Sequence, residues 1–378
     1  MNQILRLAAL LVVLALGFFT SCGRKNPTTA IEIGEIHDAA KAGDVDKVKA
    51  LIKANPDLVN NKDTNGWPPL LWATYYNHQD VVELLLANKA DINTTENDGI
   101  TPLWYAAARG YTNMVLLLIA NGADVNKHSP LEGAIMNNEY GLVPLLLSKG
   151  ADPINGDAWG NSALYRAALQ DSPLLAEILL PYFTDTNNTK YLSKTFSDAI
   201  GFGHMDVAVP ISTAALRFES NSIFESAFKG DVEGVRSYLG TKPESLNTED
   251  FLGLSPLERA VQGGQRVIAE LLVINGADIN ATDQNGIAPL HWAVCMQQSN
   301  IIQLLINLKA DLNVKGPGGN TALHLAAQAG YENAIEALVS NNTEVNVKNN
   351  KGETPLHVAV ANKHEDVADL LRQHGGHE

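Results

Sequence analysis

The feature that most constrains the fold of this chain is a short phrase that recurs at a fixed spacing. An acidic residue, an apolar residue and Asn follow one another at residues 91–93, 124–126, 278–280, 311–313 and 344–346, with the same spacing throughout each of two clusters. Self-similarity at a period of about 33 residues is typical of stacked helix–turn–helix units, each of which contacts only its neighbours. Such a stack offers a long open surface, which favours a binding protein over an enzyme.

A second phrase predicts where the helices begin. Thr-Pro-Leu or a close variant stands at residues 101–103, 288–290, 321–323 and 354–356. The Thr hydroxyl accepts a hydrogen bond from the first turn of a helix, and Pro suits the first helical position. An apolar run such as residues 81–86 has the period of an outer helix, and Gly122 suits the left-handed end of such a helix. These signals predict an all-α repeat fold.

The Thr-Pro-Leu-His and Gly-Ala-Asp-x-Asn phrases resemble those of the ankyrin repeat, over roughly residues 33–375. The resemblance is close in the second, the third and the last four of eleven units, and it is weak in between. It implies an all-α ankyrin-repeat solenoid of helix–turn–helix units joined by turn or hairpin loops. It also implies a protein partner bound along the concave face, which turn tips and inner helices form.

The order of the units indicates two blocks. A start signature at Ile36, Gly43, Pro56 and Asp63 returns, with its internal spacing unchanged, at Ile223, Gly230, Pro243 and Asp250. We therefore predict a first block at residues 33–188, a degenerate repeat or junction at residues 189–220, and a second block at residues 221–378. Two alternatives remain for the junction: a continuous solenoid with a degenerate middle, or two arrays that meet at a bend. We favour one elongated, curved body with a kink or a longer loop there.

The N-terminus carries a different kind of signal. Arg6 precedes an uncharged, apolar run at residues 7–19, and small residues follow. This order is typical of an export signal, and it predicts a signal peptide at residues 1–21. The alternative is a single membrane-spanning helix, because the apolar stretch is almost long enough to cross a bilayer with some tilt.

The end of this signal resembles the lipobox of bacterial lipoproteins, here residues 19–22. The resemblance implies a diacylglycerol on the Cys22 thiol, so that residues 22–32 form a lipidated tether. Gly23 differs from the Asp that signals inner-membrane retention in enterobacterial lipoproteins. We therefore expect a lipid-anchored protein of the bacterial cell envelope, either periplasm-facing or in the outer membrane.

The net charge of the chain limits which classes of partner it suits. The chain has 42 acidic and 27 basic residues, for a net charge of −15 at pH 7. Nucleic-acid phosphates need Lys and Arg, so this balance disfavours a nucleic-acid partner and suits a protein partner with a basic face. Cys295, the second of two cysteines, stands among apolar residues of a predicted inner helix and is expected to be a packing residue.

No motif for catalysis stands outside the repeats. His291, His324 and His357 share one position in successive units, so we expect them to bond groups of the turns and not a metal ion. Residues 316–319 are an enlarged turn, because no strand precedes them as it would a phosphate-binding loop. We predict no enzyme, no metal and no cofactor.

Partner-binding residues follow from the register of the phrases. Tyr75, Tyr76 and Arg109 have the strongest claim, because Tyr and Arg are enriched in binding hot spots. Further candidates at turn tips and on inner helices are Thr95, Glu96, Asn97, Tyr111, Asp283, Gln284 and Gln328. The alternative for either tyrosine is packing against its neighbour. We expect Trp67 to extend the patch, and packing between inner helices at Trp72, Tyr105 and Trp292. The second candidate surface is the degenerate middle, with Tyr182, Phe183, Tyr191 and Phe196.

The sequence thus predicts an envelope lipoprotein whose repeats bind another protein, as a scaffold, an inhibitor or a protective partner. The alternative is a structural spacer or a polymer-binding envelope protein. Aromatic residues clustered at sugar-stacking spacing would favour that alternative, and from the sequence only Tyr75 and Tyr76 form such a group.

Overall fold

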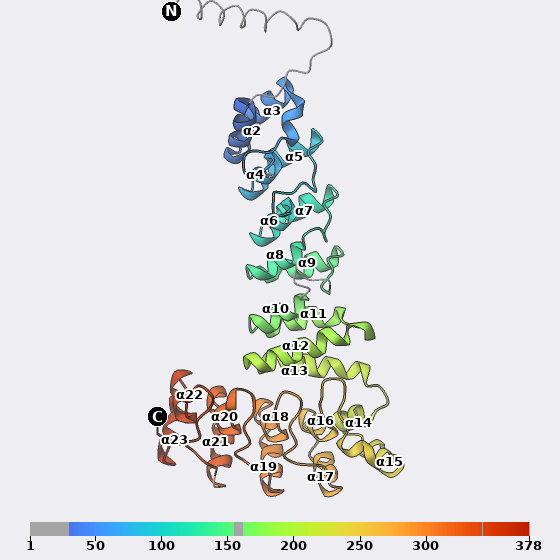
Figure 1. The fold of residues 1–378 in the computed structure, drawn as a ribbon, viewed down its shortest axis with the longest axis vertical. Coiled ribbons are helices and arrows are strands. Elements are labelled where there is room, and N and C mark those ends of the chain that lie inside the picture. The colour runs from blue at the N-terminus through green and yellow to red at the C-terminus, as the bar shows by residue number, and fades with distance from the viewer. Residues whose placement is uncertain (1–29, 155–161, 342, 378) are drawn as a thin grey trace, which may run out of the picture. The chain divides into compact units, whose positions relative to one another are not determined.

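The computed structural model describes residues 30–154, 162–341 and 343–377. This part of the chain holds twenty-two α-helices and no strand, and the helices form eleven successive pairs (Figure 1). The predicted all-α helix–turn–helix fold is therefore confirmed. Contacts divide the chain into two compact units, one of residues 1–106 and 111–124, the other of residues 107–110 and 125–378. Each unit is described below by itself. Cys22 and the predicted signal peptide lie outside the described residues.

The first unit contains three helix pairs. Their bounds are α2 (Ala30–Ala42), α3 (Val45–Ala54), α4 (Pro69–Tyr75), α5 (Gln79–Ala87), α6 (Pro102–Ala108) and α7 (Thr112–Ala120), with the 3₁₀ helix η1 (Pro56–Asn60) after the first pair. The capping signals act as expected, since Thr101 Oγ1 accepts a hydrogen bond of 3.1 Å from the Trp104 amide. Asn77 takes the left-handed conformation in place of Gly, with φ 62°. An Asn tolerates this conformation better than most residues other than Gly.

The Asn of the recurring phrase joins one turn to the next. Asn93 Oδ1 accepts a hydrogen bond of 2.8 Å from the Asp124 amide, and Asn280 Oδ1 accepts one of 2.8 Å from the Asp311 amide. The acidic residue of the phrase closes its own turn, because Asp91 Oδ1 accepts from the Asn93 amide at 3.0 Å. The constant period of the phrase therefore has a direct structural cause, in that each phrase supplies an acceptor to the turn that follows it.

The second unit begins with three less regular pairs. Their bounds are α8 (Pro130–Met136), α9 (Val143–Ser148), α10 (Ala163–Leu169), α11 (Pro173–Leu179), α12 (Thr189–Phe202) and α13 (Met205–Ala215), with short 3₁₀ helices η2 (Tyr140–Leu142), η3 (Leu180–Tyr182), η4 (Thr186–Asn188) and η5 (Leu216–Phe218). The region predicted to be degenerate is a helix pair whose first helix has 14 residues, twice the length of α10. Phe183 and Phe196 are fully buried there, so they pack in the core and cannot meet a partner.

The second block forms a row of five pairs. Their bounds are α14 (Ile223–Lys229), α15 (Val232–Thr241), α16 (Pro256–Gln262), α17 (Arg266–Ile274), α18 (Pro289–Cys295), α19 (Ser299–Asn307), α20 (Ala322–Ala329), α21 (Glu332–Val339), α22 (Pro355–Ala361) and α23 (Glu365–Gln373), with η6 (Pro243–Asn247) and η7 (Pro317–Gly319). The row starts as the described part of the chain does, because a helix pair is followed by a 3₁₀ helix in both places. The repeated start signature is thus also a repeated structure.

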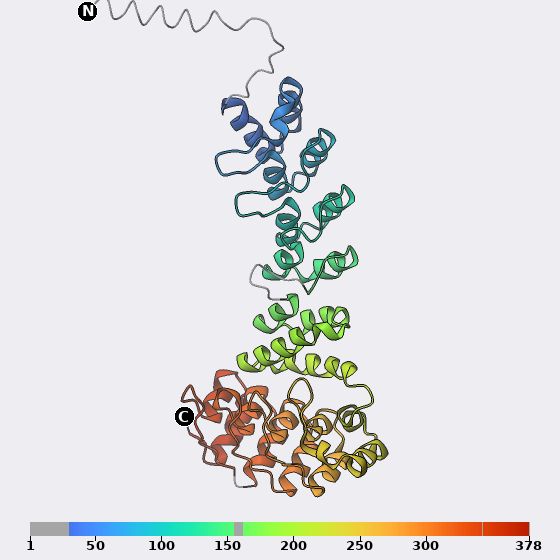
Figure 2. The same ribbon diagram turned by 45° about the vertical axis from the view of Figure 1, so that its right-hand side comes forward.

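The junction helices pack on two sides. α12 and α13 stack on α10 and α11 as one more pair of the first block. On the other side they lie along the second block, as both views show (Figures 1 and 2). Phe196 of α12 stacks on Trp292 of α18, with ring centroids 6.0 Å apart and planes within 5°. Ser212 of α13 accepts from the Arg259 guanidinium of α16 at 2.9 Å, both at its carbonyl and at its Oγ.

The inner helices of the second block are therefore covered in part by the chain itself. Within the second unit, this arrangement matches the alternative of two arrays meeting near the junction better than a continuous stack. The block boundaries at residues 33–188, 189–220 and 221–378 stay predictions, since the two compact units divide the chain elsewhere. Over the described ranges, no helix combines the length and apolar character needed to cross a bilayer.

Candidate aromatic interface

Five aromatic side chains of the first unit form one cluster, which we call the aromatic surface. Its members are Trp67, Trp72, Tyr75, Tyr76 and Tyr105. Trp67 lies at the centre, with ring-centroid distances of 4.6 Å to Trp72, 5.4 Å to Tyr75 and 5.0 Å to Tyr105. Tyr76 lies 6.1 Å from Trp72 with nearly parallel rings, and its side chain is 41% exposed. The other four are partly exposed.

Two inner helices and one turn supply these rings. Tyr75 and Trp72 stand on the short helix α4, Tyr105 stands on α6, and Trp67 comes from the turn before α4. The apolar positions of α4, including Leu70 and Leu71, are buried. The helix thereby directs its remaining aromatic residues toward the open side of the repeats.

Carboxylates fix the polar ends of two rings. Asp63 Oδ2 accepts a hydrogen bond of 3.0 Å from the Trp72 indole, while its Oδ1 accepts from the Trp67 amide at 2.9 Å. Glu96 Oε1 accepts from the Tyr105 hydroxyl at 3.1 Å. Burial raises the pKa of the Tyr105 hydroxyl well above its usual value, and the negative charge of Glu96 adds to the shift. Tyr105 is therefore a neutral hydrogen-bond donor at any physiological pH.

The Lys41 side chain places a cation over part of the cluster. The Lys41 ammonium is 5.2 Å from the Trp72 ring centroid and 5.7 Å from that of Tyr76. A cation at this distance is attracted by the negative face of the ring. The aromatic surface therefore combines an apolar centre with charged groups at its edge, among them Lys41, Asp63 and Glu96.

The structure brings Tyr75, Tyr76 and Glu96, three of the predicted binding residues of the first block, together around Tyr105. Tyr75 and Tyr76 are in contact, with centroids 5.2 Å apart, so packing and partial exposure occur together. Thr95 and Glu96 are partly exposed and Asn97 is exposed at the next turn tip. Tyr111 is partly exposed at the start of α7. Arg109 is exposed but belongs to the second compact unit, so its place beside the tyrosines stays a prediction.

The second block behaves differently. Asp283 was expected to be an exposed tip residue, and this is wrong, because its side chain is only 5% exposed. Its Oδ1 accepts hydrogen bonds from the Asn285 and Ile287 amides at 2.8 and 2.9 Å and so closes its own turn. Gln284 and Gln328 are exposed. Their binding role stays a prediction.

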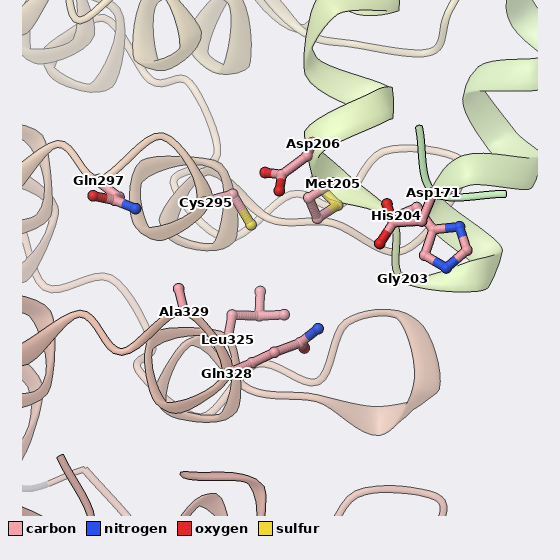
Figure 3. A pocket seen from close by; sticks show the side chains of 10 residues that line it. All are labelled: Asp171, Gly203, His204, Met205, Asp206, Cys295, Gln297, Leu325, Gln328 and Ala329. Atoms are coloured by element: carbon pink, nitrogen blue, oxygen red, sulfur yellow. The ribbon is translucent and has the colours of Figure 1, made fainter. Parts of the chain in front are cut away.

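Gln328 borders a cavity of about 260 Å³ in the second unit (Figure 3). One side of this cavity is the start of α13, with Met205 and Asp206, and the short connection before it. The other side is formed by α18 and α20, with Cys295 and Leu325. Burial raises the pKa of the Cys295 thiol to about 12, and nearby Asp206 adds to the shift. The thiol is therefore protonated at neutral pH and suited to packing.

Two of the three recurring histidines, His291 and His324, bond groups of the turns as predicted, while the side chain of His357 is exposed. His291 Nδ1 accepts from the Ala288 amide at 3.0 Å, and its Nε2 lies 3.1 Å from the Val314 carbonyl oxygen. His324 bridges the Thr321 amide and the Glu353 carbonyl in the same way. Burial lowers the pKa of His291 to about 4. No group of three potential metal ligands occurs in the described part of the chain.

Three members of the site were not chosen from the sequence as contact residues. Trp72 and Tyr105 were expected to pack between inner helices, which is true only in part, because both remain partly exposed. Lys41 was not predicted as a contact residue. The available signal was the density of aromatic residues at one register position of adjacent repeats, since Trp72 and Tyr105 stand one full repeat apart.

Repeated helix pairs, phrase-to-phrase hydrogen bonds and an aromatic surface on the inner helices define a helical-repeat binding protein. A family model for ankyrin repeats matches residues 36–129, 223–316 and 309–378. The chain therefore belongs to the ankyrin-repeat family, and its repeats form a scaffold for protein–protein interaction.

Curated relatives match only a short stretch. The NAD-capped RNA hydrolase NUDT12 of Macaca fascicularis is 30% identical over 63 residues, which are 17% of this chain and 13% of that protein. The proteins of the same name from Pongo abelii and Homo sapiens are 32% identical over 54 residues, 14% of this chain and 12% of theirs. These matches cover too little of either protein to carry a hydrolase activity across.

Proposed function

We propose that this protein is a membrane-anchored ankyrin-repeat protein of the bacterial cell envelope that binds another protein through the aromatic surface of its first block. The observation that carries the proposal is the contrast between two equivalent faces. The inner helices of the second block are partly covered by α12 and α13, while the aromatic surface keeps Tyr76 41% exposed. Exposed aromatic clusters of this kind are typical centres of protein interfaces.

The anchor is the second half of the proposal. It rests on the export signal and on Cys22 in a lipobox-like context, both read from the sequence. Two or three acyl chains hold a protein stably at a bilayer, whereas one chain binds only marginally. The lipid fixes the position, and the stacked repeats present a surface that is already ordered. We propose no catalytic role.

A protein fits the aromatic surface better than a polysaccharide does. Sugar rings stack on open faces of aromatic side chains. Here the faces of Trp72 and Tyr76 lie parallel to each other, and the Lys41 ammonium lies over both rings. The carboxylates of Asp63 and Glu96 lie at the edge of the cluster. An apolar centre with charged groups around it matches the usual make-up of a protein interface.

A pull-down from detergent-extracted native envelope tests the proposed binding. The baits are the full chain and a variant with Tyr75→Ala, Tyr76→Ala and Arg109→Glu, after circular dichroism shows that both fold alike. The matched control is Tyr182→Ala, which removes a tyrosine of similar exposure, 43%, from the second unit. We expect one protein to be retained by the full chain and the control and lost from the triple variant. Equal retention by all three would disprove the site.

The anchor is tested separately. Cells that express the full chain are fed a clickable fatty acid, and the protein is followed through membrane fractionation. We expect label on the full chain and none on the Cys22→Ser variant, which should leave the membrane fraction. A variant that stays in the membrane and lacks label would instead favour a membrane-spanning N-terminal helix.

A further inference from the structure

The two blocks of this chain can be compared position by position, because their start signatures are separated by one constant offset in residue number. At this offset Trp72 corresponds to Arg259, Tyr75 to Gln262, and Tyr105 to Trp292. The three residues of the first block belong to the aromatic surface. The three of the second block lie on α16 and α18 at the same register.

Hydrogen bonds confirm that the correspondence is structural. Asp63 Oδ2 accepts from Trp72 Nε1 at 3.0 Å, and the corresponding Asp250 Oδ2 accepts from Arg259 Nε at 2.7 Å. Asp63 Oδ1 closes its turn through the Trp67 amide at 2.9 Å, and Asp250 Oδ1 closes its own through the Leu254 amide at 3.1 Å. The Trp72 and Arg259 side chains are therefore held by the aspartates of their turns in the same way.

In the second block, the side chains at these three positions contact the helix pair α12 and α13. The Arg259 guanidinium donates to the Ser212 carbonyl, and Gln262 Oε1 accepts from Ser212 Oγ at 2.9 Å. Trp292 stacks on Phe196. Ser212 belongs to α13 and Phe196 to α12, and only two residues separate these helices in the chain. One antiparallel helix pair is therefore received by two neighbouring inner helices, with α13 against α16 and α12 against α18.

The side chains at the equivalent positions differ in burial, as expected if a helix pair covers those of the second block only. Arg259 and Trp292 are fully buried and Gln262 is 5% exposed. Trp72, Tyr75 and Tyr105 are all partly exposed. The same register positions are thus covered where a helix pair lies on them and are partly open to solvent in the first block.

We propose that the aromatic surface of the first block receives an antiparallel helix pair of a partner protein, in the arrangement in which α16 and α18 receive α12 and α13. One partner helix lies against Trp72 and Tyr75 on α4, and the next lies against Tyr105 on α6. This inference rests on the proposed function, since it describes the partner of that site. It specifies that the partner's contact region is two consecutive helices and not an extended peptide.

The residue differences between the two blocks at these positions predict the chemistry of the partner helices. Arg259 and Gln262 bind a hydroxyl and a carbonyl oxygen of α13. The Trp72 indole N–H donates to Asp63, and the Tyr75 ring packs on Trp67. This part of the surface is therefore mainly apolar. The partner helix over α4 therefore carries large apolar side chains at helical spacing. A Lys or Arg at its edge would be attracted by Glu96 and by the exposed Asp98 nearby.

Site-specific photocross-linking in the native envelope tests the inference with the full, lipidated chain. A benzophenone amino acid replaces Tyr75 in one variant and Tyr105 in another. Tyr76 serves as a second position beside the same helix in case either variant does not fold. The control probe replaces Tyr182, which is exposed in the second unit and takes no part in the aromatic surface. Mass spectrometry then locates the cross-linked residues in the captured protein.

We expect the probes at positions 75 and 105 to label two helices of one protein that follow each other in its sequence. In this chain the two contact residues, Phe196 and Ser212, stand on consecutive helices, so we expect a separation on the order of one helix pair. Labelling of an extended segment or a loop of a protein would overturn the inference and leave the proposed site intact, whereas labelling of a glycan would overturn both. Labelling from position 182 only, or no labelling from any position, would overturn both.

Discussion

At the scale of single residues, one register position shows how little change is needed to convert an internal contact into an external one. Arg259 and Trp72 stand at equivalent places and both bond the turn Asp before them. The guanidinium carries further donors, which reach Ser212 of α13. The indole has its one donor satisfied and presents an apolar ring. The first arrangement binds the chain to itself, and the second leaves a surface suited to a partner.

Glu258 opposes folding as the pH rises. Burial raises the pKa of its carboxyl to about 8, and Oε1 has no hydrogen-bond partner in the described structure. The folded state keeps this proton up to about pH 8, while the unfolded chain releases it above about pH 4.5. The folded state therefore loses stability relative to the unfolded chain as the pH rises from about 4.5 to about 8. We expect Glu258→Gln to gain stability over the natural chain between pH 5 and 8, by at most about 1.4 kcal/mol per pH unit.

Urea unfolding at several pH values measures this gain. The control is Glu225→Gln, because Glu225 has the same place after the capping Ser222 of α14. Its side chain is partly exposed, and its hydrogen bond with Lys229 lowers its pKa. That variant should show no gain that grows with pH. A flat difference between Glu258→Gln and the natural chain would show that Glu258 is ionised in the fold.

Cys295 should react slowly with thiol reagents. The thiolate is the reactive form, and burial raises the pKa of this thiol from 9.0 to about 12. In a Cys22→Ser variant, where Cys295 is the one remaining cysteine, we expect maleimide labelling at pH 8 to be slower than in denaturant by on the order of 100-fold or more. Equal rates would place the thiol in solvent and contradict the packing around the cavity.

At the scale of elements, the attachment of α13 to α16 depends on a small number of polar contacts. Ser212 Oγ accepts from the Arg259 guanidinium and donates to Gln262 Oε1. Both bonds are buried, and hydrogen bonds to charged groups contribute about 1.5–3 kcal/mol each when buried partners lose them. We expect Ser212→Ala to destabilise the chain by about 2 kcal/mol in urea unfolding. Hydrogen exchange should increase first in α12 and α13.

The neighbouring residue provides the control for this prediction. Thr213 is exposed, and its hydroxyl donates only to the Val209 carbonyl of its own helix. Thr213→Ala should change stability by less than about 0.5 kcal/mol, as surface substitutions usually do. If both variants unfold alike, the helix pair is held by its apolar contacts and not by the Ser212 network.

The helices themselves could be predicted from the sequence, while one of their contacts could not. The phrases determine each repeat locally, through a capping Thr, a left-handed Gly or Asn and an Asn that bonds the next turn. The helix pairs of the second, the third and the last four units follow from them. The contact of α13 with α16 joins residues 47 apart, and neither Ser212 nor Arg259 belongs to a phrase. Nothing in the local pattern of α12 and α13 therefore indicates that they cover a second surface.

The candidate site was predictable in part for the same reason. Tyr75 and Tyr76 stand at the register that predicts exposed inner-helix positions, and they are partly exposed and exposed, respectively. Trp72 stands where most repeats bury a side chain. Its partial exposure depends on how Trp67 and Tyr105 pack around it, with centroids of Trp72 and Tyr105 4.6 and 5.0 Å from Trp67. The prediction for Asp283 was wrong in the opposite direction. The register predicted an exposed tip residue, but the carboxylate is buried and accepts a hydrogen bond from the Asn285 amide of its own turn.

At the scale of the whole molecule, the chain contains two related surfaces with different uses. The proposed lipid at Cys22 holds the protein at a membrane, and the repeats present their surfaces without further ordering. In the second block the chain's own α12 and α13 cover part of the inner face. The first block keeps five aromatic side chains together, and three of them, Trp72, Tyr75 and Tyr105, stand at the equivalent register. The net charge of −15 adds an attraction for partners with a basic face.

The most direct test of this account compares the two blocks at one register position. Tyr75 on α4 and Gln328 on α20 occupy the same place in their repeats, and the change to Ala removes either side chain beyond Cβ. The measurement is the amount of partner retained from envelope extract by Tyr75→Ala/Tyr76→Ala and by Gln328→Ala, relative to the natural chain. We predict at least a tenfold loss for the tyrosine variant and full retention for the glutamine variant. Loss with Gln328→Ala and retention with the tyrosine variant would place the partner on the second block and contradict the account.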